Sequence, residues 1–201
     1  MDTFEAIYAR RAVKHYDPEH QFTDDELNKL MEAVIQSPTS FNIQNWRFVL
    51  VSDKETRQKV REAAFDQAQI TDASLLFVLT ADLKAWAKDP AQYWRNAPKE
   101  VQDILVPWMG PFYEGKDQTQ RDEAMRSCGI AAQTLMLGAK AMGYDSCPMI
   151  GFEADKVGEI INLPEDHTVA MIVVVGKATK PAWPKPGQLP LADVLVHNKF
   201  A

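Results

Sequence analysis

Cysteine is scarce in this chain, with only Cys128 and Cys147 among 201 residues. The two lie far apart and match neither C-x-x-C nor another metal-ligand spacing, which argues against a disulfide framework and against a zinc knuckle. No basic residue or histidine flanks Cys147, so it lacks the neighbours that activate a nucleophilic thiol. We therefore predict two reduced thiols that lie in the core.

Long apolar runs and an excess of basic residues are also missing. No apolar segment approaches the roughly 20 residues that a membrane span needs. The N-terminus, Met1 to Glu5, does not have the basic-then-apolar pattern of a signal peptide. With 22 Lys and Arg against 28 Asp and Glu, the net charge of −6 has the wrong sign for a protein whose main partner is a phosphate backbone. We expect a soluble cytoplasmic protein that binds neither nucleic acid nor a membrane.

The common catalytic motifs are absent as well. The sequence contains no phosphate-binding G-x-x-x-x-G-K-[ST] and no G-x-S-x-G nucleophile elbow. Its four histidines show no metal-ligand spacing and are interpreted as scattered and solvent-facing: His15, His20, His167 and His197. We expect no metal. An enzyme with this sequence would need a bound cofactor to supply the chemistry.

What the sequence does contain is the composition of one compact domain over residues 1–201, with 46% hydrophobic and 25% charged residues. Its basic residues gather at the two ends. Near the start stand Arg10, Arg11, Lys14 and His15, and after Gly176 come Lys177, Lys180, Lys185 and Lys199 against only Asp193. If the fold brings the two ends together, these residues would form a small cationic site suited to one phosphate group.

Apolar periodicity predicts an α+β fold with one sheet. A capping box over 23–26, followed by apolar residues at helical spacing to Ile35, predicts a helix. A shorter helix is expected from Asp2 or Thr3 to about residue 11, and another after a capping box over 52–55. Strands are predicted at 47–51, 75–79 and 169–175, and the continuous apolar run of 75–79 indicates a strand covered on both faces.

Three further segments have a distinctive character. Residues 84–119 interleave aromatic residues with prolines and are predicted to form an irregular helical excursion or lid. Residues 122–142 form a helix that is apolar nearly all round, which places it in the core or in a subunit interface. The tail over 177–201 has little periodicity and is expected to lie extended over another surface. The apolar surplus makes a dimer plausible.

Four stretches, in order and at matching spacing, resemble the FMN-dependent nitroreductase family. They are Arg10-Arg11-Ala12-Val13-Lys14 after the first helix, Ser37-Pro38-Thr39-Ser40-Phe41-Asn42-Ile43-Gln44-Asn45-Trp46 before a strand, the segment Asp145 to Phe152, and the tail segment Pro184 to Leu191. Each motif alone is weak, but four in register are specific. The resemblance covers most of the chain and leaves 84–119 unmatched.

The resemblance implies a fold, an assembly and an activity. The fold is a central, mainly antiparallel sheet flanked by helices, in an intertwined homodimer with FMN at the interface. The implied activity is hydride transfer from NADH or NADPH through flavin N5 to small, planar, electron-poor acceptors such as nitroaromatics or quinones, in a ping-pong cycle. Because the flavin carries the chemistry, no side-chain catalyst is expected. The alternative is a flavin-binding or sensing protein of the same fold without turnover.

The resemblance also assigns roles to residues of this sequence. It implies that Arg10 and Lys185 bind the FMN phosphate, and that Lys14, with Arg11 nearby, faces the N1 and O2 edge. Backbone groups of the turn after Pro148 would donate to N5 and O4. The full cofactor set is Arg10, Arg11, Ala12, Lys14, Pro38, Thr39, Ser40, Asn42, Gln67, Gln69, Pro148, Met149, Ile150, Gly151 and Lys185, with the loop from Pro38 supplied by the partner subunit. Acceptor-binding candidates are Phe41, Trp94, Trp108 and Phe112.

Each of these residues has a simpler interpretation. The basic residues can be solvated charges, the loop side chains can satisfy their own backbone, and the aromatic residues can pack within the domain. Trp46 is expected to be a core or interface anchor. The sequence also departs from the family pattern: Ala12 replaces Ser, Asn45 replaces Pro, Asp66 stands where Asn is common, and Gln188 stands where a second basic tail residue is frequent.

Overall fold

The computed structural model describes residues 1–200. Its four strands are β1 (Trp46–Leu50), β2 (Leu75–Asp82), β3 (Asp145–Met149) and β4 (His167–Gly176). Its α-helices are α1 (Thr3–Ala9), α2 (Asp24–Val34), α3 (Lys54–Ala63), α4 (Gln69–Asp72), α5 (Ala85–Lys88), α6 (Lys99–Tyr113), α7 (Asp117–Ala141), α8 (Ala154–Ile160) and α9 (Leu191–Val194). Two 3-10 helices are η1 (Ser40–Asn42) and η2 (Pro90–Trp94).

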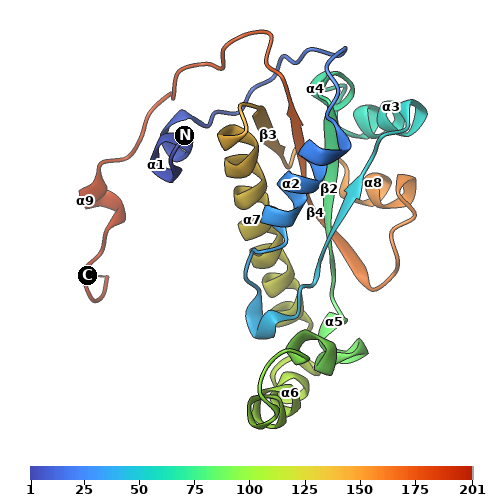
Figure 1. The fold of residues 1–201 in the computed structure, drawn as a ribbon, viewed down its shortest axis with the longest axis vertical. Helices are drawn as coiled ribbons and strands as arrows, with labels where there is room; N and C mark the ends of the chain where they lie inside the picture. Colours follow the sequence, from blue (N-terminus) through green and yellow to red (C-terminus); the bar gives the residue numbers. More distant parts are fainter. Residues whose placement is uncertain (201) are drawn as a thin grey trace.

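The strands form a single antiparallel sheet in the order β1-β2-β4-β3. Helices α2 and α7 cover one face, whereas α3, α4 and α8 cover the other (Figure 1). Because both faces are covered, β2 is buried along its whole length, as its apolar run predicts. One sheet between helices confirms the α+β class.

The register defines two ends of the sheet. Trp46 at the start of β1 pairs with Ala81 near the end of β2. At the opposite end, Asp145 at the start of β3 pairs with Gly176 at the end of β4. The chain therefore enters β1 and leaves β2 at one end, and enters β3 and leaves β4 at the other.

Helix starts follow their capping residues, with one correction. Capping boxes form as expected at Asp2 for α1 and at Thr23 for α2. For α3 the prediction was wrong, because the N-cap is Asp53 rather than Ser52. The Asp53 carboxylate accepts hydrogen bonds from both the backbone N–H and the hydroxyl of Thr56, at 2.7 Å each, and a charged acceptor at a helix start is favoured over a hydroxyl.

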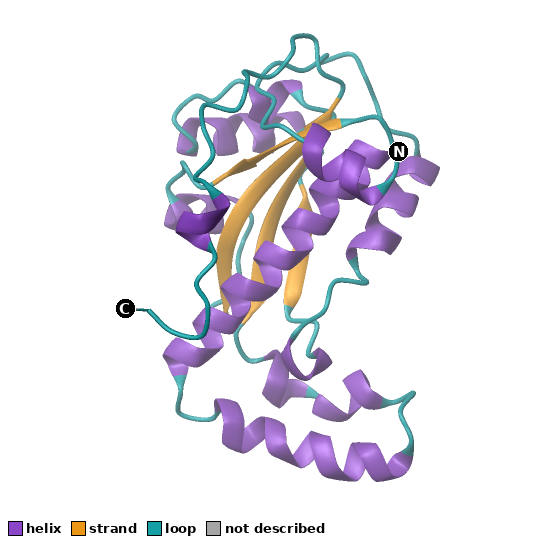
Figure 2. Cartoon of the chain, turned by 90° about the vertical axis from the view of Figure 1, so that its left-hand side faces the viewer, coloured by secondary structure: helices purple, strands orange, loops and turns teal. Residues whose placement is uncertain are grey.

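Residues 84–116, called the excursion below, form a separate helical unit at the end of the sheet where β2 finishes (Figure 2). Its main helix, α6, continues through Pro107 and Pro111, where an irregular segment was expected. The two prolines are four residues apart on the exposed side of the helix. Water can therefore hydrate the carbonyl groups that lose their N–H partners, which lowers the cost of each proline.

The two ends of the chain run together. Tyr16 and Ala178 form a β-bridge, and the N–H of Thr179 donates to the carbonyl of His15 at 3.0 Å. Beyond this contact the tail extends away from the body beside α1 (Figure 1). Every residue over 183–200 is exposed, so within the described chain the tail does not pack over the surface that the sequence predicts.

Both cysteines are free and buried, which confirms their interpretation as core thiols. Burial raises the pKa of the Cys128 thiol to about 12. Trp46 is likewise buried, in the core between the sheet and α2 and α7. Over residues 1–200, no helix combines the length and apolar character that crossing a membrane requires.

Candidate functional site

The basic residues of the two chain ends line one cavity of about 370 Å³. Arg10, Lys14 and His15 lie on one side of it, and Lys185 lies on the tail side. Within residues 1–200, no carboxylate forms an ion pair with Arg10, Lys14 or Lys185. The cavity therefore carries uncompensated positive charge, and the fold does bring the two basic clusters together.

The cations of this cavity also act on β3. Burial raises the pKa of the Cys147 thiol, and the positive charges of Lys14 and Arg10 oppose that rise. The backbone provides the connection, because Ala12 bridges to Ser146 in parallel and the N–H of Val13 donates to the Ser146 carbonyl at 3.1 Å. The cationic cavity and β3 thus belong to one site.

Arg11 makes local contacts in addition to lining the cavity. It lines the cavity, but its Nη1 donates to the carbonyls of Tyr8 at 2.6 Å and Arg10 at 2.8 Å. Its guanidinium group therefore satisfies carbonyls at the end of α1, where a positive charge is favourable. These two hydrogen bonds use Nη1 of a guanidinium group that the resemblance assigns to FMN.

Gln67, just before α4, holds the turn after β3, and Gln69, the first residue of α4, supports Gln67. Gln67 Nε2 donates to the Gly151 carbonyl at 2.8 Å. Gln69 Nε2 donates to Gln67 Oε1 at 3.0 Å and lies 3.8 Å from the Met149 sulfur. Ile150, between Met149 and Gly151, is 80% exposed, so the turn lies at the protein surface. Gln67, Gln69 and the turn after Pro148 therefore lie together at the end of β3, whereas the cationic cavity adjoins the start of that strand.

Sequence reasoning missed the strained backbone that leads into Gln67. Phe65 and Asp66 both have a φ of 56°, which costs free energy for residues other than glycine and is often found near functional sites. The Asp66 carboxylate is already engaged, because Arg61 Nε donates to it at 2.6 Å. Asp66 therefore differs from the asparagine that the family pattern suggests, since its side chain is directed into an ion pair.

The remaining predicted residues form a second cluster, where the loop over 38–44 meets the excursion. Asn42 Nδ2 donates to the Tyr93 carbonyl at 2.8 Å, and Trp94 Nε1 donates to the Phe41 carbonyl at 3.0 Å. The Phe41 and Phe112 rings lie 5.3 Å apart. Another pocket of about 370 Å³ lies between Asn42, Gln44 and residues 92–97. The loop and the excursion thus form one surface.

The backbone of this loop is strained too. Phe41, Asn42 and Gln44 have positive φ values of 50°, 54° and 41°. The Thr39 hydroxyl supports the conformation by accepting a hydrogen bond from the Gln44 N–H at 2.9 Å. Thr39 therefore serves its own backbone, as the simpler interpretation of this loop expects.

The aromatic candidates differ in exposure. Trp108 is 61% exposed and Phe112 is 44% exposed, so both reach the surface of α6. Trp94 and Phe41 are half-buried and contact each other through the hydrogen bond described above. The exposed pair is accessible to a ligand, whereas Trp94 and Phe41 form the wall between loop and excursion.

The two clusters lie at opposite ends of the sheet (Figure 1). Ser146 and the cationic cavity are at the end where β3 begins, and the loop over 38–44 precedes β1 at the other end. The structure therefore does not join all predicted site residues within one chain. A ligand that contacts both clusters needs a second copy of the chain.

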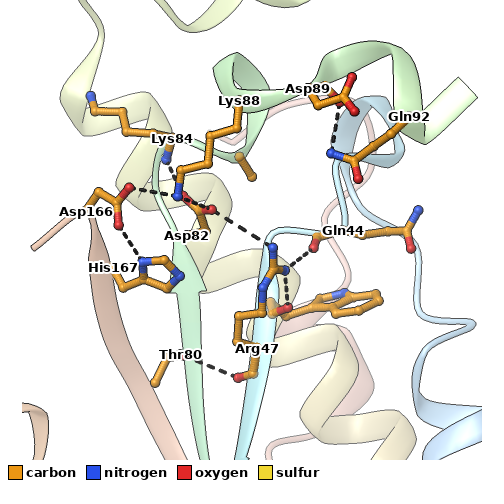
Figure 3. A network of polar contacts seen from close by, with 12 residues as sticks. Gln44, Arg47, Thr80, Asp82, Lys84, Lys88, Asp89, Gln92, Asp166 and His167 are labelled. Carbon is orange, nitrogen blue, oxygen red and sulfur yellow. Dashed lines mark hydrogen bonds and ion pairs between the residues drawn. The ribbon is translucent and has the colours of Figure 1, made fainter. Parts of the chain in front are cut away.

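A polar network occupies the base of the excursion (Figure 3). Lys88 Nζ lies between the carboxylates of Asp82 and Asp166, at 2.6 and 2.7 Å. His167 Nδ1 is 2.6 Å from Asp166, and the His167 side chain is only 12% exposed. The interpretation of His167 as solvent-facing was therefore wrong. His167 begins β4, and its Nδ1 is paired with the carboxylate of the preceding residue, Asp166. Asp82, Asp166 and His167 are close enough to share an ion, but the Lys88 ammonium group already forms ion pairs with both carboxylates.

Comparison with known proteins identifies the family. The model of the nitroreductase family matches residues 7–177. Protein DrgA of Synechocystis is 56% identical over 99% of this chain and 97% of its own length. MhqN of Bacillus subtilis, which carries the name of an NAD(P)H nitroreductase, is 32% identical over 85% of this chain and 86% of its own. The chain belongs to the nitroreductase family, which confirms the resemblance.

A solved structure supports the same conclusion at the level of the fold. The protein from Exiguobacterium sibiricum, whose structure is a complex with FMN, superposes with a TM-score of 0.91 at 28% identity. The match covers 98% of each chain. The central antiparallel sheet flanked by helices is therefore the nitroreductase fold, as the sequence predicts.

Proposed function

We propose that this protein is an FMN-dependent oxidoreductase that uses NADH or NADPH to reduce planar, electron-poor acceptors such as nitroaromatics or quinones. The observation that carries the proposal is the uncompensated cationic cavity, which both chain ends form next to the start of β3. Family membership and the FMN complex of the Exiguobacterium protein support the cofactor. The protein works in the cytoplasm.

The residues of the first cluster fit the chemistry of FMN. Its phosphate carries a charge of about −1.5 to −2, and Arg10 and Lys185 supply free cations that can form charge-assisted hydrogen bonds with it. Lys14 contributes positive charge toward the edge of the flavin ring that becomes electron-rich on reduction. Ile150 and Gly151, which are exposed in the turn after β3, offer backbone N–H donors, whereas Met149 is buried.

Bound FMN supplies the hydride acceptor and donor, and the chain's own residues bind and orient it. Lys14 favours the reduced, more negative form of the cofactor by charge, and Gln67 fixes the turn at Gly151 through its carbonyl. No side-chain acid or base is required for a hydride transfer of this kind. The protein's contribution is binding, orientation and electrostatics.

The active assembly is a homodimer. One chain separates the cationic cavity from the loop over 38–44, so Pro38, Thr39, Ser40 and Asn42 serve the cofactor of the other subunit. Exposed apolar side chains on α1 and the tail support this assembly: Phe4, Tyr8, Trp183, Leu191 and Phe200. The tail, which does not pack on its own chain, then packs on the second copy.

The excursion forms the wall that grips the acceptor. Trp108 and Phe112 present exposed aromatic surface to a planar molecule, and Trp94 and Phe41 hold the wall against the loop. Ring stacking on such a surface favours flat acceptors but makes no specific polar contacts with their functional groups. Broad acceptor specificity is the expected consequence.

Spectroscopy and kinetics of the purified protein test this function. We expect a yellow protein that releases FMN on denaturation, whose absorbance near 450 nm is lost within seconds on anaerobic addition of NADH or NADPH and returns on addition of a nitroaromatic or quinone. Colourless protein that cannot be reconstituted with FMN contradicts the cofactor. Bound FMN that neither nucleotide reduces would instead indicate a flavin-binding or sensing protein.

A further inference from the structure

The excursion is attached to the sheet through one buried carboxylate. Asp82, the last residue of β2, is only 3% exposed. Its Oδ1 accepts a hydrogen bond from the backbone N–H of Lys84 at 2.9 Å, and its Oδ2 accepts one from Lys88 Nζ at 2.6 Å (Figure 3). Both donors belong to the first residues of the excursion, 84–88, which we call its first stem. The buried end of β2 therefore holds the beginning of this unit.

Lys88 connects the same stem to a second part of the sheet. Its ammonium group lies 2.7 Å from Asp166 Oδ2, in the segment that leads into β4. The Lys88 ammonium group, and after it His167, hold the pKa of Asp166 below its ordinary value. Lys88 thus joins α5 to the end of β2 and to the start of β4 at once.

The last residues of the excursion, 113–116, form its second stem, which is held close to Lys84. Lys84 Nζ donates to Gln120 Oε1 at 2.7 Å, and Gln120 Nε2 donates to the Tyr113 carbonyl at 2.7 Å. Gln120 is buried in α7, and Tyr113 ends α6. The two stems are therefore tied to each other as well as to the sheet.

The loop of the second cluster is joined to this group through Arg47. Its Nη1 donates to the Gln44 carbonyl at 2.8 Å, and its Nη2 lies 4.0 Å from Asp82 Oδ2. Figure 3 shows Arg47 and Lys88 approaching Asp82 from opposite sides. The Asp82 carboxylate therefore contacts both the excursion, through Lys84 and Lys88, and the residue Arg47, which holds the loop over 38–44.

The packing of the excursion allows it to move as a unit. Its apolar cluster, built on Ile43, Met109 and Tyr113, is separate from the two large cores on either side of the sheet. Ile43 of this cluster belongs to the loop over 38–44, and the hydrogen bonds of Asn42 and Trp94 also join loop and excursion, so the polar contacts at the base add to these in setting the orientation of the excursion. Lys88 is 47% exposed and Asp166 is 35% exposed, so these ion pairs add little net stability, but the hydrogen bonds to the buried Asp82 favour one geometry.

We propose that Lys88 and Asp166 are positioning residues that form, with Asp82, a clasp holding the excursion against the loop over 38–44 and thereby setting the affinity for the acceptor. The effect on acceptor affinity rests on the proposed function, because it requires the excursion to be the acceptor wall. The clasp itself rests on geometry alone. It acts through Trp94 and Phe41, which join the excursion to the loop.

Two variants test the clasp, with a matched control. Asp166→Asn removes the charge of Asp166 and leaves the Asp82–Lys88 pair intact, whereas Lys88→Met removes the links to both carboxylates. Lys99→Met removes an equivalent charge from the same excursion, since Lys99 pairs only with the exposed Asp103 on α6. Lys88→Arg keeps the charge and should restore the wild-type behaviour.

We expect both clasp variants to raise the KM for a quinone acceptor by roughly threefold to tenfold, with kcat less affected. FMN content should stay at the wild-type level. Amide hydrogen exchange over 84–116 should accelerate in both, while exchange in β2 and β4 stays slow. Lys99→Met should match the wild type in every measurement.

Wild-type exchange over 84–116 in Asp166→Asn, or an unchanged acceptor KM in that variant, overturns the proposal. If Lys88→Met does not fold, Asp166→Asn alone decides, because it keeps the Asp82–Lys88 pair and leaves no buried carboxylate without its partner. A wild-type protein that binds FMN but reduces no acceptor contradicts the proposed function, and hydrogen exchange then still decides whether the clasp exists.

Discussion

Arg10 is the residue on which the cofactor assignment depends most directly. It lines the cationic cavity, and within residues 1–200 it has no ion-pair partner. Replacing it by alanine removes a charge-assisted hydrogen bond to phosphate without leaving a carboxylate unpaired. We expect Arg10→Ala to weaken FMN binding by about 1.5–3 kcal/mol, which is roughly ten- to 150-fold in Kd.

Fluorescence titration of the apoprotein with FMN measures this change. Arg121→Ala provides a control, because Arg121 is exposed on α7 and donates only to Thr168, at 3.3 Å. Unchanged FMN affinity in Arg10→Ala would remove Arg10 from the phosphate site. Equal losses in both variants would point to a general effect of charge.

Glu26, at the start of α2, makes the stability of the fold depend on pH. It completes the capping box of α2 and also accepts a hydrogen bond from the Tyr144 hydroxyl at 2.5 Å. The hydrogen bond from Tyr144, followed by those from Thr23, lowers the pKa of Glu26 from 4.5 to about 2. The folded state therefore favours the charged form of Glu26.

A lowered pKa stabilises the fold above the ordinary pKa of the group and loses that contribution as the pH falls toward 2. We expect Glu26→Gln to reduce stability at pH 7 but to flatten the decline of the melting temperature between pH 4.5 and 2. Tyr144→Phe should flatten it in part. Thermal melts across this pH range provide the measurement, and an unchanged acid limb in Glu26→Gln would contradict the assignment.

At the scale of elements, local signals in the sequence predicted most of the structure. The helix α2 and the strand β2 follow from periodicity and from an apolar run, because both signals depend on residues close in the chain. The start of α3 was misplaced by one residue, since two neighbouring residues, Ser52 and Asp53, offered caps. A helical excursion was predicted over 84–119, but not that α6 continues through two prolines, because the position of each proline relative to solvent is decided by tertiary packing.

Arg57 on α3 joins several elements in a way that the sequence did not reveal. It is buried, and its guanidinium group donates to the carbonyls of Val51, Ala73 and Ser74 at 2.8, 2.6 and 2.9 Å. These carbonyls lie after β1 and just before β2. One side chain thus satisfies the backbone at three points where the helical layer meets the sheet.

We expect Arg57→Met to lower the free energy of unfolding by about 3 kcal/mol, because it leaves buried carbonyls without donors. Arg57→Lys should recover only part of this loss, since an ammonium group cannot reproduce the planar fork. Denaturant unfolding measures both. Lys59→Met on the same helix, where Lys59 pairs only with exposed Glu55, should change stability little; a similar change in Lys59→Met and Arg57→Met would contradict this role.

At the scale of the whole molecule, the sequence identified residues but not their distribution in space. The basic clusters at Arg10 and Lys185 were found because like charges gather in two short segments, and the fold joins them. The clasp around Asp82 was not found, because Lys88 and Asp166 are far apart in the chain and no motif links them. The division of the site between the two ends of the sheet likewise follows only from strand register.

That division leads to a prediction about mixed dimers. If each FMN contacts Arg10 of one subunit and Asn42 of the other, Arg10→Ala and Asn42→Gly chains are each defective alone. Glycine is chosen at position 42 because the φ there is 54°, so the backbone is kept and only the amide is removed. In a heterodimer of the two variants, one site combines both defects and the other has neither.

Refolding the two variants together should therefore restore tight FMN binding in about a quarter of all sites, if the chains pair at random in twofold dimers. The amount of FMN retained at a concentration too low for either parent measures the restored sites. The control is a mixture of the same variants made without unfolding, which should retain no more FMN than the parents. If the site were complete within one chain, co-refolding would restore nothing, so the same titration distinguishes a shared site from a site in each subunit.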